Sequence, residues 1–187
     1  MPMPPPELLL PPTDAREPPK EPKGQIKFMT YNVLSREDVV VYKRMQAIGA
    51  SVGYHKPDVI FFQVKHRIDS YSLTNFARWK FANSPTGRSY LKAEIYPEPQ
   101  ATKPIRIART QLEFANPPAP MWCLERYVQA EHAVTFLNSA ENVVFGGDMC
   151  WRDDTDRPFP LLAGWIDAWS IRFPRDNSWT YNGLWNE

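Results

Sequence analysis

The most informative segment of the chain is Val-Val-Phe-Gly-Gly-Asp-Met-Cys-Trp-Arg-Asp, residues 143–153. Its first three residues have the apolar character of a buried strand. Two glycines follow, at which the backbone can turn tightly and leave room for a ligand. Asp148 comes directly after the glycines. Because α/β proteins place their working groups where strands end, the segment predicts a strand over 143–145 and a functional carboxylate at the edge of a sheet.

A strand–helix–strand unit is predicted near the start of the folded region. Residues 26–31 alternate apolar with polar side chains, as a strand does. Apolar residues then recur at helical spacing over 41–55, and Lys56-Pro57 stops this helix. Residues 58–62 form a second apolar run. Strand, helix and strand in this order are the βαβ pattern, which indicates an α/β fold.

The rest of the chain predicts a hairpin, a second helix and two short elements. Residues 90–96 and 105–114 alternate like strands, with a proline-containing loop between them. Helical spacing returns over 124–137, and Asn142 is predicted to end that helix. The apolar side chains that define this spacing are Leu124, Tyr127, Val128, Val134 and Leu137. The short elements are a buried helix at 165–169 and a strand or turn at 179–181.

The composition excludes several classes of protein. The 187 residues are enough for one domain with a core. Lys and Arg number 22 and Asp and Glu 21, so nucleic acid or an anionic membrane could be bound only by a local patch. Cys123 and Cys150 are too few for a disulfide framework or a zinc site and indicate an intracellular location. No segment reaches the roughly 20 apolar residues of a membrane span.

Residues 1–24 differ in composition from the rest of the chain. They contain nine of its 20 prolines, which block helices and central strands. The segment is predicted to be a disordered, Pro-rich tail, followed by a folded domain over 25–187. Two interpretations of the tail stay open: a solvated segment without a partner, or a ligand for a small protein module with an aromatic groove.

Three polar side chains follow predicted strands: Asn32, Gln63 and Asp148. Because strand ends on one edge of a sheet converge, the three can share a pocket. Two amides and a carboxylate would there suit a divalent ion with oxygen ligands and a phosphate. The alternative is that these residues only cap loops, and the residues alone leave both interpretations open.

Five segments, in order, carry a resemblance to a known family. They are Thr30-Tyr31-Asn32, Asp58–Gln63, Thr110-Gln111-Leu112-Glu113, Gly146–Met149 and Trp179-Thr180-Tyr181. In this order they resemble the endonuclease/exonuclease/phosphatase family. The Gly-Asp-Met-x-Trp segment and the Phe-Pro-Leu at 159–161 resemble its 5′-tyrosyl-DNA phosphodiesterases in their plant form. The resemblance extends, with gaps, over residues 26–187.

The resemblance implies an α/β sandwich of two packed sheets with helices outside. It also implies Mg²⁺-dependent hydrolysis that releases a tyrosine from a DNA 5′ end, a DNA-repair reaction of the nucleus. In that reaction the metal stabilises negative charge and the carboxylates position water. The family pattern makes Asn32 and Asp148 catalytic and Asn32 a metal ligand, with Glu113 as a weaker candidate ligand. The candidate substrate-binding residues are Gln63, Trp151 and Thr180.

The chain departs from the family pattern at positions that matter for catalysis. It reads Phe62-Gln63-Val64-Lys65 where the family reads Phe-Gln-Glu-Val, so the metal-binding glutamate is absent, either replaced by Val64 or deleted just before it. Cys150 stands at the asparagine of the family's Asp-x-Asn, and Gln111 at the histidine of its Thr-His-Leu-Glu. The chain also stops at Glu187, before the family's Ser-Asp-His motif, and is short of strands between Trp79 and Thr86. Each loss of a catalytic group costs powers of ten in rate, about 1.4 kcal/mol for each tenfold.

Two functions stay open at this level. One is a Mg²⁺-dependent phosphodiesterase acting on DNA 5′ ends, impaired by these losses. The other is a non-catalytic remnant, a pseudoenzyme that at most binds DNA or a protein. Cys150 is not expected to be a nucleophile, since no histidine is adjacent and Asp148 should raise the pKa of its thiol. The charged residues of 152–157 are expected to form a solvated loop, and the sandwich is expected to be incomplete, with an unpaired edge.

Overall fold

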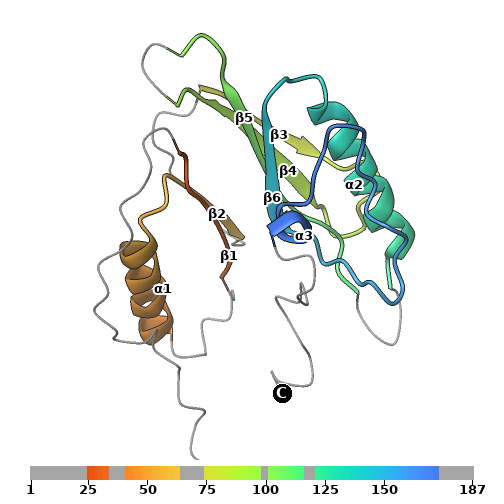
Figure 1. The fold of residues 1–187 in the computed structure, drawn as a ribbon. Coiled ribbons are helices and arrows are strands. Elements are labelled where there is room, and N and C mark those ends of the chain that lie inside the picture. Colours follow the sequence, from red (N-terminus) through yellow and green to blue (C-terminus); the bar gives the residue numbers. More distant parts are fainter. Residues whose placement is uncertain (1–24, 34–40, 64–73, 98–100, 116–120, 173–187) are drawn as a thin grey trace, which may run out of the picture.

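The computed structural model describes residues 25–33, 41–63, 74–97, 101–115 and 121–172 (Figure 1). The predictions for the Pro-rich tail, for Val64 and Lys65, and for 179–181 with Thr180 lie outside this part of the chain. The elements are, in order, β1 (Phe28–Asn32), α1 (Val41–His55), β2 (Val59–Gln63), β3 (Thr74–Lys80), β4 (Ser89–Ile95), β5 (Ile105–Gln111), α2 (Cys123–Leu137), β6 (Val143–Asp148) and α3 (Ala168–Arg172).

β1 and β2 form a two-stranded parallel sheet, with α1 between them in the chain. The register ends with Asn32 opposite Gln63, so both strands stop at the same edge. α1 ends at His55, and Lys56 turns the chain with a left-handed φ of 44° before Pro57. The predicted strand–helix–strand unit is confirmed.

The second sheet has four strands in the order β3–β4–β5–β6. β4 and β5 are the predicted antiparallel hairpin, and β6 lies parallel to β5 after α2. β3 was not predicted. It pairs antiparallel with β4, but its side chains are largely exposed and an irregular register between Thr74 and Ala77 interrupts their alternation. A periodic apolar pattern, the usual signal of a strand, is therefore missing from it.

The four-stranded sheet is covered by a different layer on each face. α2 packs on one face through the buried cluster of Phe81, Tyr90, Leu112, Ala130 and Ala133. The two-stranded sheet packs on the other through Phe61, Ala93 and Ile107. Figure 1 shows α1, the two-stranded sheet, the four-stranded sheet and α2 following one another from left to right. This is the predicted α/β sandwich of two sheets with helices outside.

The two sheets pack together closely where Phe61 of β2 lies over Gly146 of β6. A Cβ added to Gly146 would lie 3.1 Å from the Phe61 ring, so any larger residue would push that ring away. Phe61 is 5% exposed and stacks on Phe28 with 6.1 Å between ring centroids. A glycine at position 146 therefore lets β6 and β2 come together.

Gly147 continues β6 instead of ending it. Its φ is 135°, and an added Cβ would lie 2.1 Å from the carbonyl oxygen of Thr110 in β5. The strand therefore runs through both glycines to Asp148, three residues beyond the predicted end at Phe145. The prediction that the glycines terminate the strand is wrong, because the pairing with β5 holds the backbone extended as far as Asp148 opposite Gln111.

The predicted buried face of α2 is confirmed at Val134 and Leu137, which are fully buried, but not in the first half of the helix. Leu124 and Val128 are exposed, whereas Arg126 and Gln129 are fully buried. The Arg126 guanidinium is paired with Asp156 at 2.6 Å, and both side chains are fully buried. Asp156 therefore does not belong to a solvated loop as expected. A charged residue on the apolar side of a helix was not predictable without its partner, which is 30 residues away in the sequence.

Two further predictions of helix bounds are wrong. α2 ends at Leu137, with Asn138 as its C-cap, and does not extend to Asn142. The buried helix expected at 165–169 is not formed, since α3 begins at Ala168 and its residues are exposed. Across the described residues, every helix falls short of the length and apolar character that crossing a membrane requires.

Candidate functional site

Asn32 and Asp148 meet at the junction of the two sheets. Asn32 is the last residue of β1 and Asp148 the last residue of β6. The Nδ2 of Asn32 donates a hydrogen bond of 2.6 Å to Oδ2 of Asp148 across 116 positions of sequence. The structure therefore brings together the two residues that the sequence proposed as catalytic.

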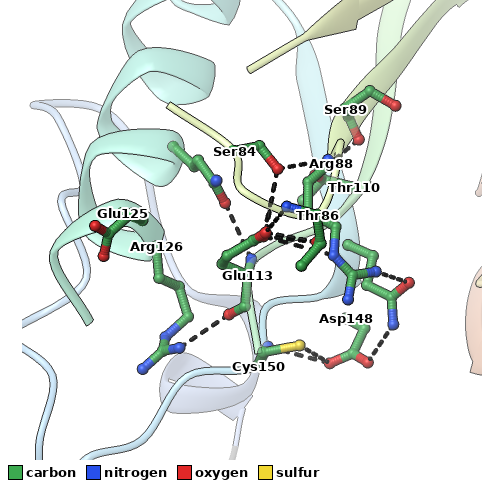
Figure 2. A network of polar contacts seen from close by, with 12 residues as sticks. Ser84, Thr86, Arg88, Ser89, Thr110, Glu113, Glu125, Arg126, Asp148 and Cys150 are labelled. Atoms are coloured by element: carbon green, nitrogen blue, oxygen red, sulfur yellow. Dashed lines mark hydrogen bonds and ion pairs between the residues drawn. The ribbon is translucent and has the colours of Figure 1, made fainter. Parts of the chain in front are cut away.

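The Asp148 carboxylate accepts hydrogen bonds on both of its oxygens (Figure 2). Oδ2 accepts from Asn32 and from Nε2 of Gln111 at 3.3 Å. Oδ1 accepts from the backbone N–H of Cys150 at 3.1 Å and from its thiol at 3.3 Å. The left-handed φ of 50° at Cys150 turns the chain back toward Asp148. Because a carboxylate offers about four lone-pair positions, these four donors occupy them.

Gln111 couples Asp148 to a positive charge. It lies opposite Asp148 in the register of β5 and β6. Its Oε1 accepts a 2.6 Å hydrogen bond from Nη1 of Arg88, while its Nε2 donates to Asp148. The sequence marked Gln111 only as a lost histidine and gave Arg88 no role. The register of the sheet, which the sequence does not specify, reveals the connection.

Glu113 lies in an enclosed network that Arg88 connects to Gln111 (Figure 2). Its carboxylate is fully buried and accepts hydrogen bonds from the hydroxyl of Ser84, and from the backbone N–H and hydroxyl of Thr86 at 2.9 and 2.5 Å. Nε of Arg88 lies 3.7 Å from Oε2. These contacts hold the turn between β3 and β4, so Glu113 serves the structure of that turn and does not face Asn32.

Gln63 and Trp151 make their hydrogen bonds to groups other than Asn32 and Asp148. Gln63 is buried, and its amide donates to two oxygens within the two-stranded sheet, at 3.0 and 2.9 Å. The Trp151 ring packs against Phe159 with 4.7 Å between centroids, and its indole N–H donates to the carbonyl of Arg157 at 3.1 Å. In this arrangement neither side chain reaches Asp148.

The thiol of Cys150 is held in its protonated form. Burial raises its pKa from the ordinary 9.0 to about 12, and the negative charge of Asp148 acts in the same direction. The direction agrees with the sequence prediction. A protonated thiol is a weak donor and no nucleophile, so Cys150 acts here only through its hydrogen bonds to Asp148.

Solved structures share this arrangement of strands and helices. TDP2 from C. elegans matches with a TM-score of 0.66 and 21% identity, over 81% of this chain and 55% of that one. A truncated C. elegans TDP2 gives 0.65, 20%, 81% and 72%. D. rerio TDP2 complexed with a single-strand DNA product gives 0.65, 16%, 81% and 71%. This chain has the TDP2 fold. No protein-family profile and no curated protein matches it.

The TDP2 fold is of the endonuclease/exonuclease/phosphatase type, so the fold that the sequence resemblance implied is confirmed. The chain spans about half the length of the C. elegans TDP2 structure. Its described residues form sheets of two and four strands, which agrees with the expected incomplete sandwich.

The residues at the site do not fit the Mg²⁺ ion that the TDP2 fold implies. Mg²⁺ requires oxygen ligands in nearly octahedral geometry. Here Asn32 turns its amide nitrogen toward the carboxylate, and the oxygens of Asp148 already accept four hydrogen bonds. Glu113 is enclosed by the turn at 84–88. Within the described ranges, no three His, Cys, Asp or Glu side chains come together as a metal site.

Proposed function

We propose that this chain binds DNA 5′ ends on a TDP2-type scaffold and hydrolyses tyrosyl adducts there weakly at most. The contact between Asn32 and Asp148 carries the proposal, because it brings the two residues that the family pattern makes catalytic together at the junction of the two sheets. Support for DNA as the ligand comes from the D. rerio TDP2 structure, which holds a single-strand DNA product. A DNA-repair role in the nucleus would follow from the same likeness.

The state of Asp148 argues against efficient hydrolysis. In-line attack on a phosphodiester needs a carboxylate with a free lone pair to orient water, and a cation to offset the developing negative charge. Asn32, Gln111 and Cys150 fill the lone-pair positions of Asp148. Arg88 supplies a positive charge, but through Gln111 and not at the carboxylate itself. The same donors that fix the orientation of Asp148 also withhold it from water.

Hydrolysis of a 5′-phosphotyrosyl oligonucleotide, with and without Mg²⁺, tests the proposal. We expect the wild-type chain to bind this oligonucleotide more tightly than the same strand with a 5′ hydroxyl, with turnover near background in either buffer. Asp148→Ala should weaken the preference for the modified end. Asp153→Ala is the matched control, because Asp153 is exposed and lies five residues away. Equal affinity for both ends would refute the proposal.

A Mg²⁺-dependent phosphodiesterase is the second candidate, because the two residues that the family pattern makes catalytic lie together; it would require Asn32 to turn its amide oxygen, and not its nitrogen, toward the metal. Robust turnover that requires Mg²⁺ and disappears in Asp148→Ala would establish it. The double substitution Val64→Glu and Cys150→Asn restores two family positions and offers a stricter comparison. If the losses at these positions are what limits the reaction, turnover should rise by more than tenfold, whereas a remnant lacking further groups should stay inert.

A further inference from the structure

The face of the four-stranded sheet that meets β1 and β2 changes character halfway along β5. Alternate residues of a strand point to one face, and on this face β5 presents Ile105, Ile107, Arg109 and Gln111 in turn. The first two lie against the two-stranded sheet, in the cluster around Phe61. The same face of β5 is therefore apolar at Ile105 and Ile107 and carries a positive charge at Arg109.

The strand register identifies the neighbours of this arginine. Arg109 lies opposite Gly146 of β6 on one side and Leu91 of β4 on the other, and Leu91 lies opposite Arg78 of β3. Arg78, Leu91, Arg109 and Gly146 thus form one row across the sheet. In the next row toward Asp148, Lys80 lies opposite Ser89. We call the three basic residues of these two adjacent rows, Arg78, Lys80 and Arg109, the basic row.

The basic row has little to neutralise it. Arg78 donates through Nε to the hydroxyl of Ser89 at 2.9 Å, which is a neutral acceptor. Among the residues that the structure describes, no carboxylate pairs with Arg78, Lys80 or Arg109. Arg109 is half-buried. Burial lowers the pKa of its guanidinium, and the nearby charge of Arg78 lowers it further. Two like charges on one face, one of them half-buried, are unfavourable without an anion.

Asp148 does not supply that anion. It is the carboxylate at the β6 end of the second row, opposite Gln111. Its oxygens accept from Asn32, Gln111 and Cys150, and none accepts from the basic row. Within the described residues, no carboxylate therefore neutralises Arg78 or Arg109, and both side chains are available to an anionic ligand.

We propose that the basic row binds the phosphodiester backbone of single-stranded DNA and so guides the strand that continues from a 5′ end at Asp148. The inference rests on the proposed function for the position of that end. Guanidinium forks match phosphate oxygens bidentately. Strands β3 and β5 are two spacings apart, about 10 Å, so the two arginines can contact different phosphates of one strand. The test also includes two other ligands that could bind the basic row: a polyanion without bases, and double-stranded DNA.

Salt-dependent binding of the double variant Arg78→Gln/Arg109→Gln tests the proposal. With an oligothymidylate strand, each lost phosphate contact should reduce the slope of log K against log salt by about 0.7, so the double variant should lose about 1.4. Its affinity at low salt should fall on the order of tenfold. Lys43→Gln/Lys103→Gln is the charge-matched control, since both lysines are exposed and lie outside the basic row. This control should keep the wild-type slope.

A second variant separates binding from a structural role of Arg109. Arg109→Met keeps the length of the side chain and removes its half-buried charge. If Arg109 is kept for a ligand, this variant should melt at or above the wild-type temperature while binding the strand more weakly. A lower melting temperature with unchanged binding would mean that the arginine supports the fold, and the proposal would be wrong.

The experiment distinguishes failure of this inference from failure of the proposed function. If the wild type prefers phosphotyrosyl ends but the double variant binds as well as the control, the basic row is not the path and the proposed function stands. If the wild type shows no preference for phosphotyrosyl ends, and the double variant binds all single strands more weakly, then the basic row binds the strand but the proposed recognition of the 5′ end is wrong. Binding of heparin or of a duplex as tight as that of the single strand would overturn the assignment of the ligand.

Discussion

Asp148 receives hydrogen bonds from both sheets and from the turn that follows it, through Asn32, Gln111 and Cys150. Asp148→Ala would leave these donors without their acceptor. We expect the free energy of unfolding to fall by about 1–2 kcal/mol, since the donors are partly accessible to water. Chemical denaturation measures the change, with the exposed Asp153→Ala as control, expected within about 0.5 kcal/mol of wild type. A gain in stability would instead indicate that Asp148 lowers the stability of the fold and is retained for a catalytic role.

Cys150 gives a pH dependence with a defined sign. Its thiol has a pKa of about 12 in the folded chain against the ordinary 9.0. Below pH 9 the thiol is protonated in both states and has no effect on the pH dependence. Above pH 9 only the unfolded chain loses the proton, so the free energy of unfolding should fall by up to about 1.4 kcal/mol per pH unit.

Denaturation between pH 8 and 10.5, compared with Cys150→Ser, measures this contribution, because the serine variant removes the thiol and retains the other titrating groups. The free energy of unfolding of the wild type relative to Cys150→Ser should be constant up to about pH 9 and fall above it. Parallel curves over the whole range would contradict the raised pKa.

At the scale of elements, β6 depends on a glycine that no other residue can replace. Gly147→Ala would place its Cβ against the Thr110 carbonyl oxygen, with φ in a region that side chains rarely adopt. Because the obstacle is backbone, the β5–β6 pairing must break, and we expect a loss of about 3 kcal/mol or more. Thermal unfolding with circular dichroism measures it.

Gly49→Ala provides the matched control within α1. An added Cβ there meets nothing within 4 Å. Alanine in a helix is favoured over glycine by about 0.5–1 kcal/mol, so this variant should be slightly more stable than wild type. If both glycine variants behaved alike, the close approach of β6 to β5 would not be the cause.

The elements predictable from the sequence are those whose burial is periodic. β1, α1, β2 and the β4–β5 hairpin follow from apolar spacing alone. β3 was not predicted because its side chains are mostly exposed. The buried face of α2 was predicted correctly at Val134 and Leu137 but not in its first half, where the burial of Arg126 depends on Asp156. At the site, the sequence predicted that Asn32 and Asp148 lie close together, but at one edge of a single sheet, whereas they end strands of two different sheets. The parts played by Gln111 and Arg88 required the register of the sheet, which no local pattern encodes.

At the scale of the whole molecule, the candidate site exists only while the two sheets stay together, since Asn32 belongs to one and Asp148 to the other. Phe61 is the buried side chain that the two-stranded sheet contributes to the core cluster between them. Phe61→Ala should cost about 3–5 kcal/mol and should detach β1 and β2 first. Hydrogen exchange would then show faster exchange in those strands, with protection in β4, β5 and α2 retained.

Phe81→Ala makes the complementary change in the other core. Phe81 is as buried as Phe61, 5% exposed, but lies in the cluster under α2. Its loss should expose α2 and the four-stranded sheet while leaving the Phe61 cluster in place. The Asn32–Asp148 contact joins the two sheets that the Phe61 cluster holds together. Phe61→Ala should therefore abolish the preference for a modified DNA 5′ end at temperatures at which Phe81→Ala still shows this preference. The same loss of preference in both variants would mean that the chain unfolds as one cooperative unit, and the site could not be assigned to the junction by this route.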